Sequence, residues 1–405
     1  MKTNTFLEKL LQGAPVEWKT LGEVTLWDKR FQGVEGQEKV LSFVHVSAAK
    51  LKSLAVENGD ITLLSTGNFE GFTNREIAEE FINSAEVITI PTGGTANIKY
   101  HNGLFVDSGN LLASSTDSDL YDLKYIYYFL KNINHIIQGF FRGSGVKHPS
   151  MPDILKIQIP IPPPAVQKEI VRILDALTAI TSELTSELTL RQKQYQHYRD
   201  QLLTFGDEVE WKTLGEVDFF EVNSGGTPSK SNLDYWNNGN IPWIKSESCN
   251  NKPIYSANNF ITEIGLKESS AKLLNPKTTL IALVGATIFK TAFLEFTATT
   301  NQNIASIKSK VPDAISDKFI FYYITNLYNK LKLEMNNYGM LNLTTLRQFK
   351  IPIPSIKEQK RIISILDKFD TLTNSLSDGL PKEIKLRQKQ YEYYRDLLLG
   401  FDNLK

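Results

Sequence analysis

Residues 17–24 read Glu-Trp-Lys-Thr-Leu-Gly-Glu-Val, and residues 210–217 repeat this stretch letter for letter. The tetrapeptide Ile-Pro-Ile-Pro also occurs twice, at residues 159–162 and 351–354. Identical motifs in the same order indicate an internal repeat. We therefore interpret the chain as one unit written twice. Each half has a variable globular block, an Ile-Pro-Ile-Pro boundary and a long polar-apolar segment.

The segments after the Ile-Pro-Ile-Pro motifs, residues 161–206 and 351–405, have the pattern of long helices. Their large apolar side chains recur in alternating steps of four and three, which is the seam of a coiled coil. Three prolines at residues 162–164 mark the start of the first helix, because proline suits its first turn. Two matching seams favour an antiparallel pair within the chain over a coil that joins two chains. About 40 helical residues span about 60 Å, so we expect the pair to separate the two blocks as a spacer.

The second helical segment carries an insertion. Leu-Arg-Gln-Lys-Gln-Tyr occurs at residues 190–195 and 386–391, an offset of 386 − 190 = 196, whereas the Ile-Pro-Ile-Pro motifs are offset by 351 − 159 = 192. Four extra residues make about one helical turn, which keeps the seam on one face. Gly379 and Pro381 fall inside this insertion, so a kink or break is expected there. Leu-Leu pairs precede both Glu-Trp-Lys-Thr motifs and recur near the end of the chain, which predicts adjacent termini in a pseudo-twofold molecule.

The globular blocks are rich in glycine, asparagine, threonine and short β-branched runs, such as residues 87–90 and 279–284. Shorter helices are expected at residues 120–137 and 316–333. These features predict an α+β fold in each block. The expected order is a globular domain at 1–160, a long spacer helix at 161–206, a second globular domain at 207–350 and a second spacer helix at 351–405.

The composition limits the class of protein. Lysine plus arginine and aspartate plus glutamate both number 45, so net charge gives no reason to expect nucleic acid or membrane, and any basic site must be local. A single cysteine, Cys249, forms no internal disulfide, and no apolar run approaches the roughly 20 residues of a membrane span. We expect a cytoplasmic protein of two or three domains.

Motifs for catalysis are missing from the sequence. No Gly-rich phosphate loop is followed by Lys-Ser or Lys-Thr, and no Gly-x-Gly-x-x-Gly follows a strand, so ATP hydrolysis and dinucleotide binding are not indicated. The five histidines have no metal-ligand spacing. Residues 152–156, Pro-Asp-Ile-Leu-Lys, come nearest to a nuclease motif, but a loop-capping aspartate explains them better. We predict no catalytic residue and no metal site.

These motifs resemble the specificity subunit of type I restriction–modification enzymes over essentially the whole chain. The resemblance rests on the repeated motifs and on Tyr-Arg-Asp near each helix end, at residues 198–200 and 394–396. The second block adds Gly-Gly-Thr-Pro-Ser at residues 225–229 and Tyr-Trp-Asn-Asn-Gly-Asn-Ile-Pro-Trp-Ile at residues 235–244, a signature of that family's target recognition domains. The first block lacks the Gly-Thr-Pro-Ser and Ile-Pro-Trp-Ile pieces, which indicates that it reads a different sequence.

The resemblance implies a non-catalytic subunit that binds double-stranded DNA. Each globular domain would be a target recognition domain for one half of a split target, and the helices would fix the gap between the halves. Two methyltransferase subunits would dock on the helices, and motor-nuclease subunits would join them. Adenine methylation, ATP hydrolysis and cleavage, with S-adenosylmethionine, ATP and magnesium, would belong to those partners.

Base readout requires forked donors and amides, and phosphate contacts require lysine, arginine and small hydroxyls on flexible loops. In the first block, residues 141–148 place basic side chains around two glycines, and weaker candidates lie in other glycine-containing loops. The predicted DNA contacts there are Arg142, Ser144, Lys147, His148, Asn68, Asn97, Lys99 and Tyr100. The alternative for residues 141–148 is a solvated loop before the helix.

In the second block, the candidates follow the Gly-Thr-Pro-Ser and Ile-Pro-Trp-Ile motifs, a glycine that ends an apolar strand, and an amide cluster. They are Thr227, Ser229, Lys230, Lys245, Ser246, Thr287, Lys290, Asn301 and Gln302. The amides could instead cap a turn. Trp236 and Trp243 are expected in the core, because duplex readout does not require them.

Four basic residues on the helices are candidates for docking a partner, with solvated faces of the coil as the alternative: Arg191, Lys193, Arg387 and Lys389. Two other functions stay open. A coiled-coil scaffold with two protein-binding domains would lack the steep salt dependence of DNA binding. A self-sufficient nuclease or methyltransferase would show activity without partners, and the missing motifs disfavour it.

Overall fold

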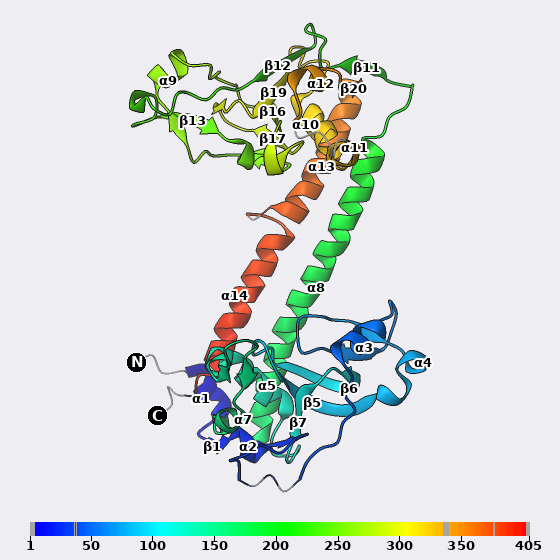
Figure 1. The fold of residues 1–405 in the computed structure, drawn as a ribbon, viewed down its shortest axis with the longest axis vertical. Helices are drawn as coiled ribbons and strands as arrows, with labels where there is room; N and C mark the ends of the chain where they lie inside the picture. Colours follow the sequence, from blue (N-terminus) through cyan, green and yellow to red (C-terminus); the bar gives the residue numbers. More distant parts are fainter. Residues whose placement is uncertain (1–4, 36, 38, 335–339, 376, 402–405) are drawn as a thin grey trace. The chain divides into compact units, whose positions relative to one another are not determined.

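The structure is a computed structural model of the 405-residue chain, and it describes residues 5–35, 37, 39–334, 340–375 and 377–401. The chain divides into two compact units (Figure 1). The first unit is formed by Met1–Leu184 together with Ile384–Lys405, and the second by Thr185–Glu383. The C-terminal segment of the chain therefore completes the unit that the N-terminal segment begins.

The first unit contains α1 (Thr5–Leu11), β1 (Glu17–Thr20), α2 (Leu21–Val24), β2 (Thr25–Trp27), α3 (Ala48–Ser53), β3 (Ile61–Leu64), β4 (Phe72–Thr73), α4 (Arg75–Ala78), β5 (Asn83–Pro91), β6 (Lys99–Asp107), β7 (Asn110–Ser115), α5 (Leu123–Asn132), α6 (Asn134–Gly139), β8 (Phe141–Arg142), β9 (His148–Pro149), α7 (Met151–Ile154), β10 (Gln158–Ile161) and most of α8 (Pro164–Leu202). A six-stranded sheet in the order β2-β7-β5-β6-β3-β4 is its centre. All neighbouring strands are antiparallel except β3 and β6. Helix α5 packs on β5 and β6 (Figure 1).

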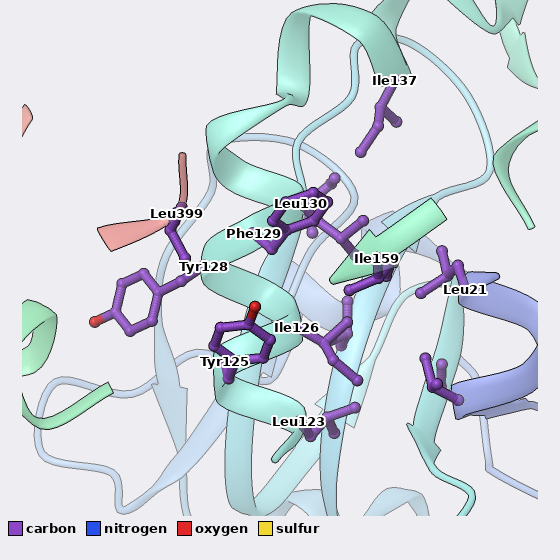
Figure 2. Close-up of a cluster of buried hydrophobic side chains, with 14 of the residues drawn as sticks. Leu21, Leu123, Tyr125, Ile126, Tyr128, Phe129, Leu130, Ile137, Ile159 and Leu399 are labelled. Carbon is purple, nitrogen blue, oxygen red and sulfur yellow. The ribbon is translucent and has the colours of Figure 1, made fainter. Parts of the chain in front are cut away.

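The core of the first unit is built on α5. Figure 2 shows Ile126 and Leu130 on the side of α5 that faces Ile159 of β10. Tyr125 is fully buried, and its hydroxyl donates a hydrogen bond to the Pro160 carbonyl oxygen at 2.7 Å. The helix expected at 120–137 is present as α5 and α6, and the run at 87–90 lies within β5.

The second unit contains the end of α8, β11 (Glu210–Thr213), β12 (Phe220–Ser224), β13 (Ile241–Ile244), β14 (Lys252–Ile254), β15 (Phe260–Ile261), α9 (Glu263–Lys267), β16 (Thr278–Ala282), β17 (Thr291–Leu294), β18 (Thr299–Thr300), β19 (Ile304–Ser309), α10 (Asp317–Asn326), α11 (Tyr328–Glu334), α12 (Leu343–Arg347), β20 (Lys350–Ile353) and α13 (Ile356–Asn374). One sheet has the order β12-β19-β16-β17-β14, and a smaller one has the order β15-β13-β18. Helix α10 packs on β16 and β17 (Figure 1). The expected helix at 316–333 and the strand at 279–284 are found as α10 with α11 and as β16, and the predicted α+β class is confirmed.

The repeated motifs pair with each other, which the sequence analysis did not predict. Strand β1 carries Glu-Trp-Lys-Thr and pairs antiparallel with β10, so that Trp18 faces Pro160. Strands β11 and β20 form the same ribbon in the second unit, where Trp211 faces Pro352. Each ribbon joins the beginning of a globular domain to its end. The Ile-Pro-Ile-Pro segment is therefore a strand that closes the domain, as well as a boundary before the helix.

Helix α8 begins at Pro164, as the three prolines predicted. The second helical segment is interrupted, as Gly379 and Pro381 predicted, because α13 ends at Asn374 and α14 (Leu380–Leu398) follows. Gly379 has a φ of 101°, and a Cβ atom there would lie 2.4 Å from the Thr371 carbonyl oxygen. Glycine alone suits this position. None of the described helices is both long and apolar enough to cross a membrane.

The ends of the helical segments pack together within each unit. Val166 at the start of α8 shares the first unit's core with Leu398 at the end of α14. In the second unit, the ring of Tyr195 near the end of α8 stacks on Phe369 of α13, with centroids 5.8 Å apart. The antiparallel coiled-coil pairing stays a prediction, although both helical segments contribute to the packing of each unit. Their role as a spacer of fixed length stays a prediction.

The two ends of the described chain also meet in the first unit. The rings of Phe6 in α1 and Tyr394 in α14 are 6.3 Å apart, edge to face. Leu7 and Leu11 of α1 share a buried core with Leu399. The adjacent termini expected from the nearly circular repeat are therefore confirmed.

Each helix contacts its globular domain through the same three residue types, an aspartate, a tyrosine and a lysine, at equivalent positions of the two repeats. Asp175 of α8 accepts a hydrogen bond from the Tyr128 hydroxyl at 2.6 Å and pairs with Lys124 at 2.7 Å. Asp367 of α13 accepts a hydrogen bond from the Tyr322 hydroxyl and pairs with Lys318 at 3.0 Å. The repeat therefore extends to the attachment of each domain to its helix.

Candidate nucleic-acid interface

One edge of the second unit collects strand ends from both of its sheets. The end of β12 pairs with the start of β19 through Ser224 and Ala305, and the end of β16 pairs with it through Ala282 and Ile304. Strand β13 ends beside β18, which leads directly into β19. The loops that follow β12, β13, β16 and β18 therefore emerge together. We name this place the recognition edge.

All of the predicted DNA contacts of the second block lie in these loops. Residues 227–230 follow β12, 245–246 follow β13, 287–290 connect β16 to β17, and 301–302 connect β18 to β19. The hydroxyl of Thr227 donates to the side-chain carbonyl oxygen of Gln302, which directly links two of the loops. The structure thus brings together residues that are far apart in the sequence. Their contact with DNA stays a prediction.

The candidates at the recognition edge differ in exposure. Ser229, Lys230 and Gln302 are exposed, whereas Ser246 is buried. The hydroxyl of Thr287 donates to the Ser246 carbonyl oxygen at 3.0 Å, so these two residues join their loops to each other. The exposed side chains are the ones placed to meet a ligand.

Asn301 is a buried amide at the recognition edge, with 8% of its surface exposed. Its side-chain oxygen has no hydrogen-bond partner among the described residues. Burial without a partner costs free energy, typically about 1–3 kcal/mol. The role of Asn301 in contacting DNA stays a prediction.

Trp243 is buried, and Trp236 is partly buried against it, so both belong to a small core as expected. Their rings are edge to face, with centroids 5.0 Å apart. The ammonium of Lys245 lies 5.8 Å from the centroid of the Trp243 ring. A lysine that was predicted to contact DNA is thus placed against this core.

In the first unit, the segment 141–148 forms a short hairpin of β8 and β9, and Ser144 and Lys147 are exposed at its tip. The Gly94 backbone N–H donates to the Lys147 carbonyl oxygen at 2.8 Å, and the His148 ring hydrogen-bonds the Thr92 carbonyl oxygen at 2.7 Å. The hairpin is therefore fixed to the β5–β6 loop. Arg142 forms an ion pair with Asp153 at 3.0 Å.

The other four candidates of the first block line one groove between the β3–β4 loop and β6: Asn68, Asn97, Lys99 and Tyr100. The Lys99 ammonium donates to the Ser65 and Gly67 carbonyl oxygens at 2.7 Å each, and the Asn97 amide donates to Gly67 at 2.9 Å. Burial lowers the pKa of Lys99. Lys99 and Asn97 thus hold the β3–β4 loop, at which Asn68 is exposed.

Tyr100 faces a carboxylate in the same groove. Its hydroxyl donates a hydrogen bond to Glu86 at 2.7 Å. Burial and this carboxylate raise the pKa of the Tyr100 hydroxyl, so the group stays protonated and acts as a donor. The groove has a mixed polar and apolar lining, and several of its donors are already engaged within the chain.

The sequence analysis missed a charged cluster at His45. Its ring nitrogens lie 2.7 Å from Asp107 and 3.2 Å from Asp28, both fully buried carboxylates. Hydrogen bonds to Asp107 and Asp28 raise the pKa of His45 to about 9. The three residues are distant in sequence and match no motif, so spacing alone could not have found them. The cluster ties the segment after β2 to the sheet.

The four docking candidates on the helices are exposed or partly exposed to solvent. Arg191 pairs with Glu187 at 2.7 Å, Arg387 donates to Gln390 at 2.8 Å, and Lys193 and Lys389 are exposed. Among the described residues, no group of three or more His, Cys, Asp or Glu is arranged to hold a metal ion.

The two units share a repeated plan, and each carries amides, hydroxyls and basic side chains in its loops. A family model described as "Type I restriction modification DNA specificity domain" matches residues 45–191 and 207–386, once in each half. The chain is 38% identical to a type I restriction enzyme specificity subunit of Escherichia coli, over 99% of this chain and 98% of the relative. It is 33% identical to a putative type I restriction enzyme specificity subunit of Haemophilus influenzae, over 99% of this chain and all of the relative.

Among solved structures, the fold is similar to the crystal structure of a type I restriction–modification S subunit from M. genitalium. The TM-score is 0.63 at 17% identity, and the match covers 98% of this chain and 99% of the other. The chain belongs to the type I restriction–modification specificity subunit family. It is a non-catalytic subunit that recognises DNA sequence, as the repeated motifs indicated.

Proposed function

We propose that the chain binds a split DNA target, with one globular domain for each half-site. The observation that carries this proposal is the repeat itself. The ribbons β1–β10 and β11–β20 and the attachments at Asp175 and Asp367 are the same in both units. The loops that present polar side chains differ between the two units. A common frame with different loops is suited to reading two different short sequences.

The residues that we propose for DNA contact differ between the units. The first unit offers the 141–148 hairpin and Asn68, and the second offers the recognition edge. Lysine and arginine suit guanine or phosphate, and asparagine and glutamine suit adenine. Half-sites on one side of B-DNA lie about 34 Å apart per helical turn. Helix α8, with 39 residues, is long enough for such a gap, at about 58 Å.

The chemistry would come from partners in the cytoplasm. Two methyltransferase subunits would dock on the helices through Arg191, Lys193, Arg387 and Lys389, and motor-nuclease subunits would join them. S-adenosylmethionine, ATP and magnesium would be used by these partners. One solved chain of similar fold, with a TM-score of 0.52, is described in terms of the complex assembly of the type I R-M system. This description supports a role for the present chain within an assembly.

The test is methylation-sensitive sequencing of DNA from cells that express this chain with its matching methyltransferase subunit. Cells that lack this chain are the control. We expect a new adenine motif with two fixed halves and an unread gap. If the complex assembles and no motif appears, the proposal is wrong and a scaffold for protein partners becomes the better interpretation.

A further inference from the structure

The loop at residues 225–231, Gly-Gly-Thr-Pro-Ser-Lys-Ser, is tied to the recognition edge at successive positions. The Gly225 backbone N–H donates to the Ile304 carbonyl oxygen at 3.0 Å, and the Gly226 N–H donates to Thr300 at 2.9 Å. Thr227 reaches Gln302 through its hydroxyl. The loop therefore begins in a fixed position beside β18 and β19.

The two glycines allow this close approach. A Cβ atom at Gly225 would lie 2.3 Å from the Asn301 carbonyl oxygen, and one at Gly226 would lie 2.4 Å from the Ser270 carbonyl oxygen. No side chain fits at such distances from backbone atoms. The glycines thus account for the start of the loop, but not for the position of its exposed part.

Two tryptophans hold the rest of the loop. The indole N–H of Trp243 donates to the Gly226 carbonyl oxygen at 3.0 Å, and the indole N–H of Trp236 donates to the Ser229 carbonyl oxygen at 3.0 Å. The rings pack edge to face against each other. An indole N–H only donates, and its ring is rigid, so each contact sets one direction for a loop carbonyl group.

Trp243 also lies near the loop after β13, because the Lys245 ammonium is 5.8 Å from the centroid of its ring. The same indole therefore contacts side chains or backbone from the loops after β12 and β13. The side chains of Ser229, whose carbonyl oxygen accepts the second indole bond, and of Lys230, which follows it, are exposed. The tryptophans do not need to touch DNA to determine how these side chains would meet it.

We infer that Trp236 and Trp243 are positioning residues for sequence recognition by the second domain. Their indole N–H groups fix the backbone of the 225–231 loop and so set the geometry with which Ser229 and Lys230 meet the bases and phosphates. This inference rests on the proposed function. It assigns the two tryptophans a role beyond filling the core.

The test replaces each indole by a ring without the N–H, in the variants Trp243→Phe and Trp236→Phe. The control is Trp211→Phe, because the Trp211 indole donates a bond of 3.0 Å to Gly206, away from the recognition edge. This bond is exposed, as is the bond that Trp236 donates. Each full-length variant is assembled with its methyltransferase subunits. Methylation is then measured on duplexes in which every base of both half-sites is varied singly.

We expect Trp243→Phe to lower discrimination at the half-site of the second domain by about 5- to 10-fold, the value of one hydrogen bond. Trp236→Phe should have a similar effect. Discrimination at the other half-site should be unchanged in both variants, and the melting temperature of Trp236→Phe should match that of Trp211→Phe. A purely structural role would instead lower the melting temperature or total methylation, with the base preferences intact.

The outcomes separate the inference from the proposed function. If the wild-type complex shows no split motif, the proposed function fails and the inference falls with it. If the wild type shows the motif and neither variant changes the base preference of the second domain's half-site, the inference alone is wrong. Equal losses at both half-sites would also contradict it.

Discussion

Gln167 and Gln359 occupy equivalent positions in the two repeats and make the same three hydrogen bonds. Both are fully buried. The Gln167 amide oxygen accepts a hydrogen bond from the Asp122 backbone N–H at 2.9 Å. Its NH2 group donates to the carbonyl oxygens of Leu120 at 2.9 Å and Pro162 at 2.8 Å. The Gln359 amide oxygen accepts from the Ser316 backbone N–H, and its NH2 group donates to the carbonyl oxygens of Ala314 and Pro354, at 2.8 Å each.

These glutamines join three segments of each half at one point. The segment before α5 or α10, the end of the Ile-Pro-Ile-Pro strand and the first turn of the long helix all meet at the buried amide. Because the amide is fully paired in both halves, the orientation of each domain on its own helix is fixed in the same way. The loops can differ between the halves without disturbing this attachment.

The first prediction concerns the stability of this junction. Gln359→Ala leaves a buried N–H and two carbonyl oxygens without their side-chain partner, so the free energy of unfolding should fall by about 2–4 kcal/mol. Gln167→Ala should have the same effect. Urea denaturation measures the change, and the exposed Gln192→Ala, expected to change it by less than about 0.5 kcal/mol, is the control. Equal stability of Gln192→Ala and Gln359→Ala would contradict the role of the buried amide.

The second prediction concerns pH. The carboxylates of Asp28 and Asp107 raise the pKa of His45 from 6.5 to about 9. Protonated His45 therefore stabilises the folded chain, by less than about 3.4 kcal/mol because solvent screens this partly exposed ring. The stabilisation is complete below pH 6.5 and is lost as the pH rises through about 9.

Denaturation of the wild type and of His45→Gln between pH 6 and 10 measures this contribution. The wild type should be the more stable at pH 6, and the difference should shrink as the pH approaches 10. His135→Gln, at an exposed histidine, is the control and should show no such trend. A difference that is constant over this range would mean that His45 does not carry the charge.

The sequence predicted features that depend on one segment of chain. The repeat is visible because the same letters recur. Helix α8 begins at Pro164 because proline has no N–H to donate within a helix and so suits the first turn. The break beside Gly379 was predicted because glycine suits backbone angles that other residues avoid. Likewise, the β-branched run at 87–90 predicted part of β5 without any knowledge of its neighbours.

Strand registers and side-chain clusters that join distant segments could not be predicted. Trp18 and Pro160 face each other because of a strand register that neither motif encodes alone. His45 and Asp107 are 62 residues apart, and neither stands in a recognisable spacing. The candidate residues of the second block were chosen singly by chemical type. Their meeting at the recognition edge depends on the registers of β12, β16 and β19.

The third prediction concerns the salt dependence of DNA binding. The chain has equal numbers of acidic and basic residues, so we expect weak binding by the isolated chain and tighter binding with its methyltransferase subunits. If Lys230 contacts a phosphate, Lys230→Ala should lower the slope of log affinity against log salt by about 1. Fluorescence anisotropy with the assembled complex measures the slope.

The control for Lys230 is Lys277, which is exposed and precedes β16, at the opposite end of that strand from the recognition edge. Lys277→Ala should leave the slope unchanged. Equal slopes for the two variants would place Lys230 away from the phosphates. Tight binding by the isolated chain at physiological salt would contradict the expected need for partners.

The last prediction separates stability from recognition at Asn301. Its side-chain oxygen is buried and has no hydrogen-bond partner in the part of the chain that the structure describes, so we expect the amide to contribute little to the stability of the free chain. Asn301→Ala should therefore leave the free energy of unfolding unchanged or raise it. At the same time, preference at the second domain's half-site should fall by about 1–3 kcal/mol if the amide reads a base.

Asn83 supplies the matched control, because it has the same 8% exposure but its amide is paired with both backbone groups of Val44, at 2.8 and 2.9 Å. Asn83→Ala should lower the free energy of unfolding by about 1–3 kcal/mol and leave the second half-site preference intact. Urea denaturation and methylation of singly varied duplexes give both quantities for both variants. A loss of stability in Asn301→Ala as large as in Asn83→Ala, with recognition unchanged, would show that the Asn301 amide serves the fold and not the DNA.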